Sequence, residues 1–114
     1  MPLKNVTKNQ PIVKNVNVAR DFWTRVRGLI GRDTLSDEET LFFERCSSIH
    51  TCFMRFPIDV VFINKEFKVQ RTFENVKPWR LIMPVPGARS VFEFKSGVIR
   101  QKQISVGDQL NVEP

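Results

Sequence analysis

Short apolar segments separated by turn-forming residues fill most of the chain beyond residue 40, and this pattern constrains the fold more than any other sequence feature. The predicted strands are Ile12–Val18, a segment around Phe42, Ser47–Met54, Asp59–Asn64, Phe67–Val76, Ser90–Lys95 and Gln109–Val112. Phe67–Val76 alternates between apolar and polar residues, as a strand does when one of its faces is buried. The chain is therefore predicted to be mainly β.

The length of 114 residues suits one domain, because two domains would each fall near the lower limit for an independent core. Residues 1–11 are polar and contain two prolines, so we expect a flexible arm ahead of a single β-rich domain over residues 12–114. The predicted architecture is a compact antiparallel β-barrel or sandwich with one or two short helices, mainly β and at the margin of the α+β class.

Two segments predict short helices. Between Ala19 and Ile30, apolar residues recur at spacings of three and four, which is the period of an amphipathic helix. A second short helix is predicted near Gly97–Lys102. Ser36 and Glu39 match a capping box, but the apolar block that follows them is too short for a helical stripe and indicates a turn and then a strand.

Residues 77–89 are rich in proline and are predicted to lack regular structure, although several of them, including Trp79, are apolar. Loops of this length in a compact domain are usually functional or packed against the core. Two interpretations stay open. The loop either covers an open end of the core, which we favour, or forms a mobile lid over a binding site.

The chain carries 18 Lys and Arg residues against 12 Asp and Glu residues, a formal net charge of +6. This charge favours encounters with acidic partners such as nucleic acid, anionic lipid or acidic protein, but the interpretation we favour is that moderate excess charge keeps a small domain in solution. No run of like charges resembles a nucleic-acid-binding tail. A nucleic-acid-binding β-barrel with stacking aromatic residues is a less favoured alternative, because most of the 10 Phe residues occupy core-like positions.

The two cysteines, Cys46 and Cys52, are too few for a disulfide-rich secreted scaffold. Residues 1–18 contain no apolar stretch long enough for a signal peptide, and no segment resembles a transmembrane helix. We therefore expect a cytoplasmic protein with reduced thiols; an envelope location would require a leader that this sequence does not show. The sequence does not indicate whether the protein is a monomer or an oligomer.

The segment Cys46–Ile63 holds more reactive groups than any other, among them the single histidine of the chain, His50. If the two strands that flank Pro57 pair with each other, His50 lies opposite Ile63 and shares one face of the sheet with Asp59. A shift of the pairing by one residue would send these side chains to opposite faces. The predicted site therefore depends on the strand register.

Three interpretations of this segment remain open. Cys52, His50 and Asp59 are the residue types of a thiol-dependent enzyme, although no nucleophile turn accompanies them. Cys46, His50 and Cys52 are possible metal ligands, but they lack a clear fourth ligand, so no metal is predicted. The favoured interpretation is structural: a buried cysteine, a hydrogen-bonded histidine, and an aspartate that accepts hydrogen bonds from the backbone.

Two carboxylates later in the chain, Asp108 and Glu93, are given structural rather than catalytic interpretations. Asp108 follows Gly107 in a turn, where glycine allows a positive φ, and both are predicted to be structural. Glu93 interrupts an apolar segment and is either a solvent-facing residue or the partner of an arginine, for which Arg55 and Arg89 are the candidates.

Four motifs together resemble one family. They are ARDFWTRVRGLIGR, LFFERCSSIHTCFMRFPIDVVFINKEFKV, PGARSVFEFKSG and VGDQL, which occur in this order between Val16 and Val112. In these motifs the chain resembles the uncharacterised family called domain of unknown function 192. The resemblance implies a compact, mostly antiparallel β domain with no established reaction or cofactor. Many members of the family lack the thiol, which argues against a catalytic role for Cys52.

The resemblance also marks positions that are characteristic of the family. In this chain they correspond to Arg27, Gly28, Leu29, Gly31, Arg32, Met54, Pro57, Ile58, Asp59, Glu93, Gly97, Gly107 and Asp108.

The sequence as a whole predicts a small non-enzymatic module that binds an unidentified ligand or protein partner and uses no cofactor. The predicted ligand contacts are His50, Arg55, Asp59, Trp79 and Arg89, because polar and polarisable groups gather there beside the apolar, proline-rich loop. The thiol-dependent enzyme and the nucleic-acid-binding barrel are the two alternatives.

Overall fold

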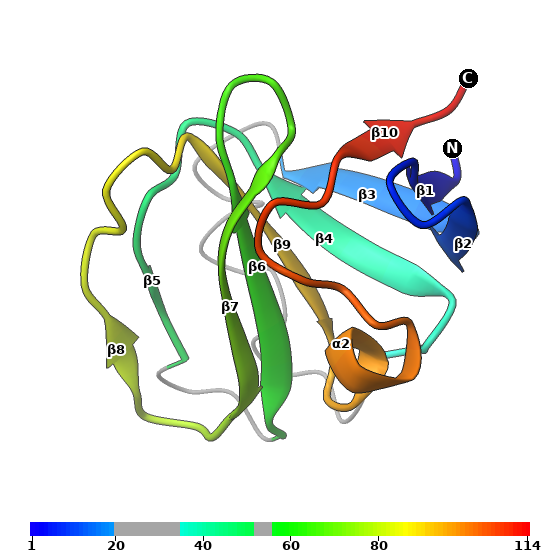
Figure 1. The fold of residues 1–114 in the computed structure, drawn as a ribbon. Coiled ribbons are helices and arrows are strands. Elements are labelled where there is room, and N and C mark those ends of the chain that lie inside the picture. The colour runs from blue at the N-terminus through cyan, green and yellow to red at the C-terminus, as the bar shows by residue number, and fades with distance from the viewer. Residues whose placement is uncertain (20–34, 52–55) are drawn as a thin grey trace.

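A five-stranded sheet forms the centre of the protein in the computed structural model, which describes residues 1–19, 35–51 and 56–114 (Figure 1). Its strands, in spatial order, are β3 (Asn15–Ala19), β4 (Glu39–Phe43), β9 (Ser90–Lys95), β6 (Ile58–Ile63) and β7 (Val69–Val76). Neighbouring strands are antiparallel except β3 and β4, which run parallel. All six residues of β6 are buried, as expected for a strand with neighbours on both edges and cover on both faces.

A three-stranded sheet and a short helix cover one face of this central sheet. The small sheet has the order β10 (Leu110–Val112), β1 (Leu3–Asn5) and β2 (Gln10–Val13), and it brings the two ends of the chain together (Figure 1). The helix is α2 (Val98–Gln101). The core on this side contains Leu3, Ile12, Val13, Val16, Phe42, Val61, Ile63, Val69, Phe92, Phe94, Val98, Ile99, Ile104 and Leu110.

The two-stranded ribbon of β5 (Ile49–His50) and β8 (Leu81–Ile82) belongs to the other side of the molecule. A second core lies here, formed by Leu35, Leu41, Phe43, Ile58, Val60, Phe62, Val85 and Val91. Successive residues of β6 alternate between the two cores, so one strand supplies both. The described strands form a sandwich-like arrangement and do not close into a barrel, which confirms the predicted mainly β class.

The local predictions hold for most elements. The strands predicted over 59–64, 67–76, 90–95 and 109–112 appear as β6, β7, β9 and β10, with small shifts at their ends. The predicted turn and strand at residues 36–43 is confirmed by β4. Glu39 Oε1 accepts a hydrogen bond from the backbone N–H of Ser36 at 3.1 Å, so the capping-box pattern here stabilises a turn ahead of a strand.

One predicted strand is divided. Residues 12–18 were expected to form a single strand, whereas the chain breaks at the exposed residue Lys14 and contributes β2 to the small sheet and β3 to the large one. The backbone N–H groups of Lys14 and Asn15 both donate to the carbonyl of Glu38, at 3.1 Å each. The pattern of apolar residues is continuous across this break because each half buries its side chains in the same core.

The N-terminal arm is a further correction. Leu3 and Asn5 are fully buried, and β1 pairs with both β2 and β10. The flexible arm was predicted from the polar composition of residues 1–11, but a three-residue strand needs only one or two apolar side chains to join a core.

The two helix predictions differ in outcome. The helix predicted near Gly97–Lys102 is confirmed by α2, which begins after Gly97 with its left-handed φ of 102°. The helix predicted over Ala19–Ile30 lies outside the described residues, except for Ala19, which ends β3. Within the described residues, no helix has the length and apolar character that crossing a membrane requires.

Candidate functional site

The strand pairing on which the sequence-based site depended is wrong. Ile63 of β6 pairs with Val69 of β7 and with Ser90 of β9, so both edges of its strand are occupied. His50 pairs instead with Leu81 of β8. A strand as uniformly apolar as β6 is most stable between two neighbours, and because β7 and β9 are those neighbours, no edge of β6 is left for the predicted hairpin partner.

Asp59 lies on β6 and is completely buried. Its Oδ1 accepts the backbone N–H of Asn75 at 2.8 Å, and its Oδ2 accepts those of Gly97 at 3.0 Å and Ile99 at 2.9 Å. Asp59 therefore caps the start of α2 from a neighbouring strand and fixes the irregular end of β7, where Asn75 has a φ of 52°.

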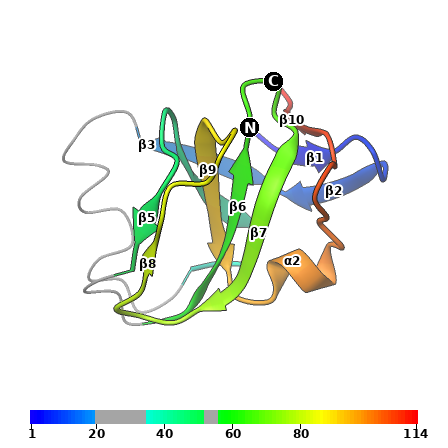
Figure 2. The same cartoon turned by 60° about the vertical axis from the view of Figure 1, so that its left-hand side comes forward.

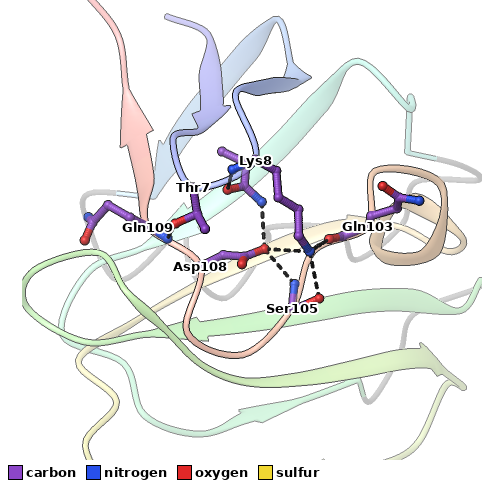
Figure 3. Close-up of polar contacts among 7 residues, drawn as sticks. Thr7, Lys8, Gln103, Ser105, Asp108 and Gln109 are labelled. Atoms are coloured by element: carbon purple, nitrogen blue, oxygen red, sulfur yellow. Dashed lines mark hydrogen bonds and ion pairs between the residues drawn. The ribbon is translucent and has the colours of Figure 1, made fainter.

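Asp108 likewise accepts several hydrogen bonds, at the place where the two ends of the chain meet (Figure 3). Its Oδ2 accepts Asn5 Nδ2 at 2.8 Å and the backbone N–H of Ser105 at 2.9 Å, and it lies 3.1 Å from Lys8 Nζ. Burial by itself would raise the pKa of this carboxyl, but the hydrogen bonds from Asn5, Ser105 and Lys8, together with the charge of Lys8, lower it. The structural role predicted for Asp108 agrees with these contacts.

An open groove of about 620 Å³, which we call the basic groove, lies between β7 and the segment that follows it. Its lining consists of Arg71, Phe73, Asn75, Val76, Lys77, Arg80, Leu81, Ile82, Met83, Pro84 and Val85. After β7 the chain turns and returns as β8 (Figure 2). Residues of both strands line the groove.

The lining of the basic groove combines positive charge with apolar surface. Arg71, Lys77 and Arg80 are exposed, and no acidic side chain is among the lining residues. The guanidinium carbon of Arg71 lies 4.7 Å from the centre of the Phe73 ring, a cation–π contact that holds one charge over the apolar floor. The groove is therefore suited to an anion that also carries an apolar group.

Thr51 fixes the rim of the basic groove. Its side chain is fully buried, and Oγ1 donates to the carbonyl of Lys77 at 2.7 Å and accepts the N–H of Arg80 at 2.8 Å. Its backbone N–H donates to the carbonyl of Arg80 at 2.8 Å, and its carbonyl accepts the N–H of Trp79 at 3.1 Å. These bonds hold the turn in which Trp79 has a left-handed φ of 65°. Sequence reasoning missed Thr51, since nothing in its pattern distinguishes it from any other polar strand residue.

The structure separates the residues that the sequence predicted as ligand contacts. Trp79 is 59% exposed and lies between two lining residues of the basic groove in the chain. Arg89 lines a different pocket of about 240 Å³, with Phe42, Glu44, Arg45, Asn64, Lys65, Phe67 and Ser90. Asp59 is enclosed beside α2. Arg55 lies outside the described residues, and of His50 only the backbone is described.

The other predicted chemistry falls largely outside the described residues. Cys52, the proposed nucleophile, is one of the undescribed residues. The thiol of Cys46 donates a hydrogen bond to the carbonyl of Ser48 at 2.8 Å. No group of three or more His, Cys, Asp or Glu residues that could hold a metal ion occurs in the part of the chain that the structure describes.

Glu93 is buried rather than solvent-facing. It lies on β9 between Leu41 and Val60, and burial raises its pKa to about 8. Of its two candidate partners, Arg89 forms no ion pair with it among the described contacts, and Arg55 is not described. A carboxyl in such surroundings stays protonated at neutral pH.

The comparisons with known proteins agree with the sequence motifs. A UPF0127 protein of Pyrococcus furiosus is 35% identical over 109 residues, which make up 93% of each chain. A UPF0127 protein of Pyrococcus horikoshii is 31% identical over 93% of this chain and 94% of its own. A Novosphingobium aromaticivorans protein of unknown function, with a solved crystal structure, superimposes with a TM-score of 0.86 over 98% of this chain and 84% of its own, at 23% identity. Residues 4–112 match DUF192, described as Uncharacterized ACR, COG1430, and the chain belongs to that family.

Proposed function

We propose that this protein is a non-enzymatic binding module whose basic groove takes a ligand or protein partner that carries negative charge beside an apolar group. One observation carries the proposal: three exposed basic side chains and no acidic one line an open groove whose floor is apolar. Exposed charges contribute steering and orientation, whereas contact with Phe73, Val76 and Ile82 supplies apolar burial.

Of the five contacts predicted from the sequence, the proposal keeps Trp79. Its exposed ring follows Lys77 and precedes Arg80, both of which line the basic groove. His50, Arg55, Asp59 and Arg89 remain predictions that rest on the sequence. We propose the cytoplasm as the location, because two cysteines are too few for a disulfide-rich secreted scaffold.

Octanoate and octylammonium test the proposal, because they share an apolar tail and differ in the sign of the charge. We expect octanoate to shift the amide NMR signals of residues 71–85 in the isotope-labelled protein, with an affinity that falls as salt is added. Octylammonium should produce much weaker shifts there. Equal binding of both probes, or shifts confined to other parts of the protein, would overturn the proposal.

A pair of triple variants supplies the matched control. Arg71→Gln, Lys77→Gln and Arg80→Gln together should weaken octanoate binding by about tenfold, since each exposed ion pair contributes up to about 1 kcal/mol. Lys65→Gln, Lys68→Gln and Lys95→Gln remove the same charge from exposed positions outside the basic groove. This second variant should bind octanoate almost as well as the parent protein.

A further inference from the structure

Among the described strands, β8 is paired along one edge only. β8 pairs with β5 at Leu81 and Ile82, and among the described strands it has no second neighbour. β7, the next strand along the wall of the basic groove, pairs with β6 and does not pair with β8. An unpaired strand edge presents backbone N–H and C=O groups that an added strand can satisfy.

Exposed apolar side chains gather in this segment. Leu81 and Met83 are 68% and 66% exposed, whereas Ile82 between them packs against the second core, and Trp79 in the preceding turn is 59% exposed. Trp79, Leu81 and Met83 are half of the six large apolar side chains that the described residues expose. Exposed apolar groups concentrated in one short segment mark an interaction surface.

The basic side chains beside this edge favour a partner that carries negative charge. Lys77 and Arg80 flank Trp79 in the chain, and Arg71 lines the opposite wall on β7. The hydroxyl of Thr51 bonds to the backbone carbonyl of Lys77 and the backbone N–H of Arg80, so the main chain that carries these two charged side chains is held beside the strand edge. A partner that follows the edge therefore meets basic groups at both walls.

We propose that the basic groove takes an extended acidic segment of a partner protein, which adds as a strand to the edge of β8 that does not pair with β5. The proposal rests on the proposed function and specifies its partner. Backbone hydrogen bonds to Leu81–Met83 would provide the register, acidic side chains would approach Arg71, Lys77 and Arg80, and apolar side chains would cover Leu81 and Met83. A segment of six residues spans about 20 Å as a strand, which is more than the length of residues 81–83.

The test uses a capped hexapeptide of alternating Glu and Leu and two N-methylated forms of it, one methylated at the odd and one at the even positions. A strand pairs along one edge through every second residue, so one methylated form should bind about tenfold more weakly and the other about as well as the parent peptide. The amide signals of Leu81 and Met83 should shift most.

The outcomes separate this proposal from the proposed function. If the two methylated peptides bind equally well, or lose affinity equally, strand addition is overturned. This outcome does not depend on whether octanoate binds. If octanoate binds and the peptide does not, the acidic-peptide partner is overturned and an anion-binding groove remains. The same conclusion follows if a single-stranded oligonucleotide of equal charge binds more tightly than the peptide at the same residues. Failure of both octanoate and the peptide would overturn both proposals.

Discussion

Asn5 donates a hydrogen bond from Nδ2 to Oδ2 of Asp108 at 2.8 Å, across 103 positions of the sequence. Both side chains are buried, and the bond joins β1 to the turn that precedes β10. Lys8 adds a charge to the same oxygen and also donates to Ser105 Oγ and the carbonyl of Gln103 (Figure 3). The three-stranded sheet therefore depends on one carboxylate that both ends of the chain share.

Asp108→Asn should destabilise the protein by about 1–3 kcal/mol at pH 7, because it removes charge-assisted hydrogen bonds in a buried site. The pKa of Asp108 is lowered from 3.8, so its contribution is present above that value and is lost as the pH falls through the lower pKa of the folded state. The stability difference between parent and variant, measured by urea unfolding, should shrink in acid. A difference that stays constant from pH 7 to pH 2 would contradict this account.

Asp59→Ala should destabilise the protein by roughly 2–4 kcal/mol, because three backbone N–H groups lose their acceptor at once. Asp59→Asn keeps one carbonyl oxygen and should lose less. Hydrogen exchange locates the effect: the amides of Gly97 and Ile99 should exchange faster in both variants, while those of β1 should not. If these amides keep their protection in Asp59→Ala, the carboxylate does not cap α2.

Glu93→Gln should remove a pH dependence of stability. The folded-state pKa is raised from 4.5 to about 8, so the contribution of Glu93 is complete below pH 4.5, declines as the pH rises, and is lost above about pH 8. The amide of Gln does not titrate, so the variant should match the parent near pH 4 and exceed its stability by roughly 3 kcal/mol near pH 7. Urea unfolding over this range measures the difference; a pH-independent difference would show that Glu93 does not carry the raised pKa.

Much of the fold could be predicted because strand formation depends on local pattern. The alternation of Phe67–Val76 and the apolar run at 58–63 identify β7 and β6 without any knowledge of their neighbours. Pairing is different, since it depends on which edges meet after the chain collapses. The predicted hairpin around Pro57 failed for this reason: β6 pairs with β9, more than 25 residues further along the chain, and leaves no edge for residues 49–50.

The candidate site could be predicted only in part. Trp79 was predicted as a contact because it is an aromatic residue in a proline-rich loop; its chain neighbours Lys77 and Arg80 line the basic groove, whereas Trp79 itself is not among the lining residues. The groove itself arises because β7 and β8 follow each other in the chain without pairing, a relationship that no local pattern reveals. Arg71 and Arg80 appear in the sequence as two among 18 basic residues, and only the fold brings them to one surface.

Thr51→Val should loosen the rim of the basic groove while preserving the fold, because valine has the shape of threonine but no hydroxyl. The N–H of Arg80 loses its 2.8 Å bond to Oγ1, whereas the N–H of Trp79 keeps its bond to the backbone carbonyl of residue 51. We expect the Arg80 amide to exchange at least about tenfold faster, the Trp79 amide to change little, and octanoate binding to weaken. Thr51→Ser keeps the hydroxyl and should behave like the parent protein. Unchanged exchange at Arg80 in Thr51→Val would mean that the hydroxyl does not position this side of the groove.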